Sequence, residues 1–152
     1  MSIERTLVLI KPDAIQRGLS GTVLSRLESR GLKLVAMKMI HVSKGLASTH
    51  YEAQRGKPHY ESLIDFITSS PLIALVIEGR KAVEAVRSTM GSTDPVKSQP
   101  GTIRGDLGLD IQHNLVHGSD STESATIEIG LFFDKEEILD YDRDVDRWII
   151  ES

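Results

Sequence analysis

The chain has 152 residues, the length of one ordinary domain, and we expect residues 1–152 to form a single domain. It is 39% hydrophobic and 26% charged, a composition that is typical of globular proteins and excludes an intrinsically disordered chain. It contains no cysteine, which excludes a disulfide scaffold, a thiol nucleophile and a cysteine-based zinc finger. The formal net charge of −4 makes the protein a poor candidate for non-specific binding to nucleic acids.

The N-terminal sequence MSIERTLVLIKPD does not have the form of a targeting signal, because Glu4 and Arg5 precede a short apolar run and Lys11 follows it. No apolar stretch approaches the roughly 18 residues that a membrane-spanning helix needs. We therefore expect a cytoplasmic protein without a membrane partner.

The first half of the chain alternates between strand and helix patterns. A short run of leucine and β-branched residues, Thr6 to Ile10, is ended by Pro12 and predicts a buried strand. Ser20 can cap a helix that continues to Arg30, where Gly31 follows as a stop signal. Further along, the patterns predict a strand over Leu32–Val42 and helices over Ser43–Gln54 and Tyr60–Thr68.

The second half begins with Leu72–Ile77 (LIALVI), the strongest buried-strand signal in the chain. A helix over Arg80–Met90 follows, with Ala82, Val83 and Val86 facing inward. The alternating stretch Thr126–Phe133 (TIEIGLFF) predicts a last strand, after which Asp134 caps a short acidic helix.

Without its insertions, this order is β-α-β-β-α-β, the split-βαβ or ferredoxin-like plan of the α+β class. We expect a four-stranded antiparallel sheet with helices over one face. Many unrelated functions use this fold, so the fold alone does not assign one.

The net charge is distributed unevenly along the chain. From Asp134 to the C-terminus there are eight acids and three bases, whereas Arg80 to Arg104 holds five bases and two acids. The acidity therefore lies in the tail, and the body carries a local positive cluster that suits a small polyanion such as a triphosphate.

The region Gly91–Asp120 predicts a long loop inserted before the last strand, and loops of about thirty residues are either functional or disordered. Leu109, Ile111 and Leu115 can anchor such a loop against the body. Its glycine-rich backbone beside Thr93, Thr102 and Arg104 offers amides, hydroxyls and a guanidinium, which are groups that bind phosphate.

His117 follows two apolar residues and precedes Gly-Ser-Asp, which makes it a candidate functional histidine, although a structural histidine is the alternative. His113 and His117 are four residues apart and could share zinc on a helix. NLVHGSD is not a helical pattern, however, and in a strand the two residues would lie about 13 Å apart.

Further candidate site residues are Lys11, Arg87 and Glu128. Each also has an ordinary explanation as a solvated surface charge: the lysine follows a strand, the arginine lies on a helix, and the glutamate stands between two isoleucines. The chain has neither the GxxxxGK[ST] nor the GxGxxG motif, which argues against a P-loop nucleotidase and a Rossmann cofactor site. The stacking aromatics of an RNA-binding domain are absent too.

The sequence closely resembles the nucleoside diphosphate kinase family. The resemblance is carried by ERTLVLIKPDAIQRGLSG, GLKLVAMKM, PGTIRGD and above all NLVHGSDS, which matches the family signature N-x-x-H-G-S-D. These stretches occur in the family's order over essentially the whole chain, and PGTIRGD together with NxxHGSD is highly specific.

The resemblance implies a ping-pong transfer of the γ-phosphate of a nucleoside triphosphate to a nucleoside diphosphate, with Mg²⁺ carried by the nucleotide. His117 matches the nucleophile that becomes a phosphohistidine, and Asp120 matches at most a water-mediated contact to the metal. Glu128 and Ser119 would orient the imidazole. The remaining matches are phosphate ligands (Lys11, Arg87, Thr93, Arg104), a sugar contact (Asn114, with Lys11 also near the ribose) and a tyrosine close to the nucleophile (Tyr51).

Two positions depart from the family pattern: His59 replaces the usual phenylalanine that stacks on the base, and Ile77 replaces a frequent tryptophan. Stacking without hydrogen bonds predicts broad base specificity. The family is oligomeric, and the full-length loop and long tail favour a homo-hexamer over a tetramer. The alternatives are an inactive nucleotide-binding module of the same fold and a ferredoxin-like domain that binds nucleic acid.

Overall fold

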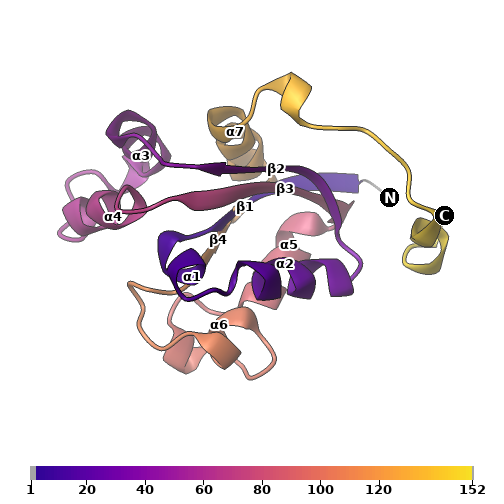
Figure 1. The fold of residues 1–152 in the computed structure, drawn as a ribbon, viewed down its shortest axis with the longest axis horizontal. Coiled ribbons are helices and arrows are strands. Elements are labelled where there is room, and N and C mark those ends of the chain that lie inside the picture. Colours follow the sequence, from indigo (N-terminus) through magenta and orange to yellow (C-terminus); the bar gives the residue numbers. More distant parts are fainter. Residues whose placement is uncertain (1–2, 152) are drawn as a thin grey trace.

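The computed structural model describes residues 3–151, and its centre is an antiparallel sheet (Figure 1). The strands described are β1 (Ile3–Ile10), β2 (Lys33–Ile40), β3 (Leu72–Arg80) and β4 (Val116–Gly118). They lie in the order β2-β3-β1-β4, and each pairs antiparallel with its neighbour. The expected ferredoxin-like α+β fold is confirmed, since β3 lies between β1 and β2 as the split-βαβ plan requires.

Helices connect these strands, and up to residue 90 they lie close to the expected positions, apart from a short helix over Pro12–Gln16 that was not expected. Ser43 accepts a hydrogen bond from the amide of Leu46 and so starts the third helix as expected. The α-helices are α1 (Pro12–Gln16), α2 (Ser20–Ser29), α3 (Lys44–His50), α4 (Tyr60–Ile67), α5 (Ala82–Met90), α6 (Ile103–Leu107) and α7 (Thr122–Phe132). The short 3-10 helices are η1 (Glu52–Gln54), η2 (Pro95–Lys97), η3 (Lys135–Glu137) and η4 (Asp144–Trp148).

Helices cover both faces of the sheet, so the expectation of a single covered face was wrong. Alternate residues of β1 point to opposite faces. Val8 and Ile10 join a buried cluster with residues of α2, α5 and α6, whereas Leu7 and Leu9 join one with residues of α3, α4 and α7. Figure 1 shows these two layers on either side of the strands.

The predicted last strand, Thr126–Phe133, is instead part of helix α7, and the strand that completes the sheet is the shorter β4. The Ser121 hydroxyl accepts a hydrogen bond from the amide of Ser124 and caps the helix. Ala125 and Phe132, seven residues and two helical turns apart, are both buried. Capping and packing thus outweigh the strand preference of isoleucine and phenylalanine here.

The long segment after α5 is ordered by η2, α6 and β4 rather than lacking regular structure. Leu115 is fully buried, but the side chains of Leu109 and Ile111 are 80% and 53% exposed, so these two do not anchor the loop as expected.

Asp134 and Glu137 form a capping box around η3, which confirms the predicted acidic helix start. No helix within residues 3–151 is long and apolar enough to cross a membrane.

Candidate active site

His117 lies in the middle of the edge strand β4, where register fixes the direction of its side chain. It is paired with Leu9 of β1, and directly opposed residues of an antiparallel pair point to the same face. Leu9 belongs to the cluster under α3, α4 and α7. The imidazole is therefore directed toward these helices rather than toward α5.

Helix α7 holds the imidazole by one nitrogen. His117 Nε2 lies 2.7 Å from Glu128 Oε1, and the buried Ser119 hydroxyl donates to the same oxygen at 2.9 Å. Partial burial alone would raise the pKa of Glu128, but the hydrogen bonds from His117 and Ser119 lower it on balance. An ionised carboxylate fixes the proton of a neutral imidazole on Nε2 and leaves the Nδ1 lone pair free.

The backbone just before His117 is strained. Leu115 has a φ of +74°, and the amide of Val116 bonds to the carbonyl oxygen of Asn114 at 2.8 Å, which forms a γ-turn. Such a turn at a bulky residue persists only where surrounding contacts hold it. Two contacts do: the Leu115 amide donates to Asp13 Oδ2, and its carbonyl oxygen accepts from the amide of Lys11.

Lys11 follows β1 and reaches the same end of the sheet. Its ammonium group donates to Asn114 Oδ1 at 2.8 Å. The side-chain amide nitrogen of Asn114, Nδ2, in turn donates to the Thr93 carbonyl oxygen at 2.9 Å. Burial and the nearby charge of Arg104 lower the pKa of Lys11 to about 8. Among residues 3–151 no salt bridge joins Lys11 to a carboxylate, and a buried ammonium group in that situation is well suited to receive an anion.

Arg104 is buried and binds three backbone carbonyl groups. Its guanidinium donates to the carbonyl oxygens of Asn114, Gly91 and Val116, at 3.0, 3.1 and 2.6 Å respectively. Burial and then the charge of Arg87 lower its pKa to about 10. Arg104 therefore ties the end of α5 to β4 while it adds positive charge beside Lys11.

Arg87 and Asp120 lie near the end of β4 and are exposed. Arg87 donates from α5 to the carbonyl oxygen of Gly118, the residue after His117, at 3.1 Å. Both line an open depression between the starts of α5 and α7. The structure thus places the cation of Arg87 and the carboxylate of Asp120 within reach of solvent near the end of β4.

His50, at the end of α3, is a site residue that the sequence analysis did not identify. Its ring centroid lies 4.8 Å from that of His117, with the two planes at 82°, and it also contacts Tyr51 and Phe132. Burial raises the pKa of Tyr51 to about 12. A histidine in a helix of no distinctive pattern gave no signal in the sequence, and only the packing of α3 against β4 identifies it.

His59 and His113 lie outside this cluster. His59 is exposed at the start of α4, with Nε2 2.8 Å from Gln54 Oε1. His113 packs against Phe66, with ring centroids 5.0 Å apart. Among residues 3–151, the group of three potential metal ligands that contains His117 is completed by His50 and Glu128 and does not include His113.

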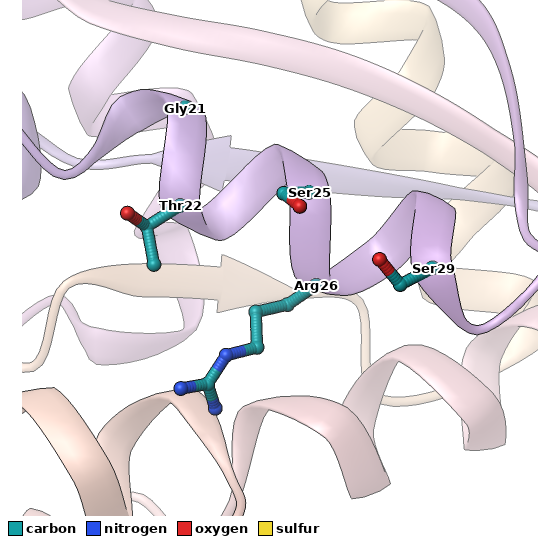
Figure 2. Close-up of a pocket in the computed structure, with 5 residues that line it drawn as sticks. All are labelled: Gly21, Thr22, Ser25, Arg26 and Ser29. Atoms are coloured by element: carbon teal, nitrogen blue, oxygen red, sulfur yellow. The ribbon is translucent and has the colours of Figure 1, made fainter.

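A second depression lies on the outer face of α2 and contains none of the predicted site residues. Gly21, Thr22, Ser25, Arg26 and Ser29 line it, and Arg26 projects away from the helix (Figure 2). Arg26 is an ion-pair partner of Asp106, at 2.8 Å, and donates to the Gly101 carbonyl oxygen. It therefore links α2 to α6.

Comparisons with known proteins agree with this geometry. Residues 4–138 match the family model described as nucleoside diphosphate kinase. A nucleoside diphosphate kinase from Thermomicrobium roseum is 55% identical, covering 97% of this chain and 99% of that protein, and one from Pyrococcus furiosus is 56% identical, covering 91% and 88%. A halophilic nucleoside diphosphate kinase from Halobacterium salinarum, solved in complex with CDP, superimposes with a TM-score of 0.96 at 47% identity, covering 99% of this chain and 100% of that one. The chain belongs to the nucleoside diphosphate kinase family, whose members are phosphotransferases.

Proposed function

We propose that this chain acts as one domain that transfers the γ-phosphate of a nucleoside triphosphate to a nucleoside diphosphate through a phosphohistidine at His117. The observation that carries the proposal is the contact between His117 Nε2 and Glu128. Because this contact occupies one ring nitrogen, the lone pair of Nδ1 is available as the nucleophile. Among residues 3–151, no hydrogen bond engages Nδ1 of His117.

In the first half-reaction, Nδ1 forms a bond to the γ-phosphorus, and the bond from that phosphorus to the β,γ-bridging oxygen breaks. The electron pair leaves with the nucleoside diphosphate. The ring becomes positively charged as the N–P bond forms, and the adjacent Glu128 carboxylate stabilises that charge. A terminal oxygen of a second nucleoside diphosphate then bonds to the phosphorus, the N–P bond breaks with its electron pair returning to Nδ1, and the neutral imidazole is regenerated.

The cations around β4 bind the phosphates in this proposal. Lys11, Arg87 and Arg104 neutralise the charge that spreads over the phosphoryl oxygens in a loose transition state. The Thr93 hydroxyl supplies a further phosphate contact, Asn114 contacts the sugar, and the Tyr51 side chain lies near the transferring group. The buried ammonium group of Lys11 supports this assignment. Among residues 3–151 it donates to the Asn114 side chain but forms no salt bridge with a carboxylate, so its charge is left to be balanced by phosphate.

The nucleotide carries Mg²⁺ into the site in the proposed complex. Apart from Asp120, the predicted phosphate ligands of the protein are cations, amides and hydroxyls, which offer Mg²⁺ few oxygen ligands. This set of side chains fits an Mg²⁺ ion that is coordinated mainly by phosphate and water oxygens. Bound there, Mg²⁺ would neutralise charge on the phosphate oxygens. The exposed carboxylate of Asp120 would contact its hydration shell.

The proposal extends to base specificity, assembly and location. An exposed imidazole at His59 offers a flat surface to any base, which supports broad specificity. We propose a cytoplasmic homo-hexamer that binds neither nucleic acid nor membranes.

Two-substrate kinetics test the reaction. A ping-pong mechanism predicts parallel lines in double-reciprocal plots and exchange of label between ATP and ADP without a second nucleotide pair. His117→Ala abolishes both activities, whereas His113→Ala, in a histidine outside the cluster, retains them. Converging lines together with no ATP–ADP exchange would contradict the mechanism, and nucleotide binding without any transfer would favour the inactive binding module.

A further inference from the structure

Three side chains from three elements converge on one point beside the proposed nucleophile. His50 comes from α3, His117 from β4 and Glu128 from α7. One potential ligand atom of each lies within 4.8 Å of the others, and all three side chains are half-buried. The proposed phosphotransfer uses His117 and Glu128 but gives no role to His50.

His50 is a neutral nitrogen donor with unused capacity. Its Nδ1 is buried and has no hydrogen-bond partner among residues 3–151. Burial lowers the pKa of His50 well below its ordinary value, so the ring is neutral at physiological pH. Buried polar atoms without a partner are uncommon in folded proteins, and a neutral imidazole is the form that binds metals.

We propose that His50, His117 and Glu128 form an inhibitory site for a divalent transition metal such as Zn²⁺. Two imidazoles and one carboxylate are the donor set of zinc sites that keep a fourth position open. Mg²⁺ prefers oxygen ligands in an octahedral arrangement, so this donor set selects against the ion that the nucleotide carries.

Metal binding requires a small opening of the existing contact. With metal–ligand bonds of about 2.0–2.1 Å, the ligand atoms of a tetrahedral zinc site lie about 3.3 Å apart. The 2.7 Å between His117 Nε2 and Glu128 Oε1 must therefore lengthen by several tenths of an ångström, while His50 moves closer. The side chains of His117 and Glu128 are 22% and 17% exposed, which leaves room for this adjustment.

The metal would inhibit by reversing the tautomer of His117. Ligation by Nε2 displaces its proton, and in the neutral metal-bound ring the one remaining proton occupies Nδ1. The lone pair that attacks phosphorus is then absent. Inhibition rests on the proposed phosphohistidine function, whereas metal binding itself does not.

Titration of the nucleotide-free protein with Co²⁺ tests binding, because tetrahedral Co²⁺ with nitrogen ligands absorbs visible light. We expect one Co²⁺ per chain, displaced by Zn²⁺, and binding weakened at least about tenfold in His50→Asn, by the scale of losses at metal sites. His50→Phe keeps a ring against His117 but removes both nitrogens, and should weaken binding equally. His41→Asn is the matched control, since His41 is exposed and its Nε2 bonds to the Thr68 carbonyl oxygen.

A second assay measures inhibition of phosphate exchange by Zn²⁺ at fixed Mg²⁺–nucleotide, with each variant normalised to its own zinc-free rate. We expect the zinc concentration for half-inhibition to rise in both His50 variants and to stay unchanged in His41→Asn. No Co²⁺ binding, or equal binding in the parent and the His50 variants, overturns the site. Co²⁺ binding by a parent protein that shows no exchange would instead count against the proposed function alone.

Discussion

Glu128 Oε1 lies 2.7 Å from Nε2 of His117, and this contact joins helix α7 to the edge strand β4. It sets the ring tautomer, and it brings a negative charge to the side of the ring opposite the proposed point of attack. The proposed mechanism therefore depends on a pair of residues eleven positions apart in the chain.

Replacing Glu128 tests the orienting role. Glu128→Gln keeps the size of the side chain but removes the charge and lets an amide donor face Nε2. The loss of a hydrogen bond to a charged group is about 1.5–3 kcal/mol, so kcat/KM should fall about 10- to 100-fold. Glu123→Gln, on an exposed residue in the first turn of the same helix, is the control. An unchanged rate in Glu128→Gln would remove Glu128 from the mechanism.

The two arginines make a matched pair with different expected effects. Arg104→Lys leaves buried carbonyl groups without donors and should lower the free energy of unfolding by about 2–4 kcal/mol while raising KM for nucleotides. Arg87→Lys, at an exposed residue, should raise KM but change stability by no more than about 0.5 kcal/mol. Urea denaturation and steady-state kinetics measure both quantities. Equal losses of stability in the two variants would contradict the buried anchoring of Arg104.

The lowered pKa of Lys11 predicts a pH dependence of nucleotide capture. In the free enzyme Lys11 carries its charge below a pKa of about 8 and loses it above that value. Since kcat/KM reports the ionisation of the free enzyme, it should decline as the pH rises through about 8. Lys11→Arg keeps its charge, so this alkaline decline should disappear from its profile. A wild-type profile that is flat from about pH 7 to about pH 10 would contradict a phosphate-binding role for Lys11.

His59 offers a test of base stacking. Phenylalanine presents a larger apolar face than imidazole, so His59→Phe should tighten nucleoside diphosphate binding by up to about 1 kcal/mol. Isothermal titration calorimetry measures the change in Kd. The substitution also removes the contact with Gln54, and Gln54→Ala serves as the control for that loss. Unchanged or weaker binding in His59→Phe would refute the stacking role.

Apart from the short helix α1, the strands and helices up to Met90 could be predicted from sequence because they bury regular apolar patterns between clear stop signals. The same rule failed at TIEIGLFF, where alternation predicted a strand and the Ser121 cap produced a helix. It also missed β4, because a three-residue strand containing His117 and a glycine has no periodicity to detect. The helical turn, rather than strand alternation, is what directs Glu128 toward His117.

The expected roles of the site residues came from the family resemblance over the whole chain, of which NxxHGSD and PGTIRGD are the most specific parts, since a lone lysine, arginine or glutamate is usually a surface charge. Sequence could not supply what depends on long-range packing: the burial of Lys11 and Arg104, the γ-turn at Leu115, and His50 against His117. These features arise where β1, β4, α3 and α7 meet, and no local pattern encodes that meeting.

Labelling of His117 tests the central claim most directly. The protein is incubated with ATP labelled in the γ-phosphate, and the site of the label is determined by peptide mapping. We predict label on His117 that is lost in acid and stable in alkali, as expected for a phosphorus–nitrogen bond, and no label in His117→Ala. Acid-stable label on a serine, or exchange at the wild-type rate by His117→Ala, would contradict the phosphohistidine mechanism.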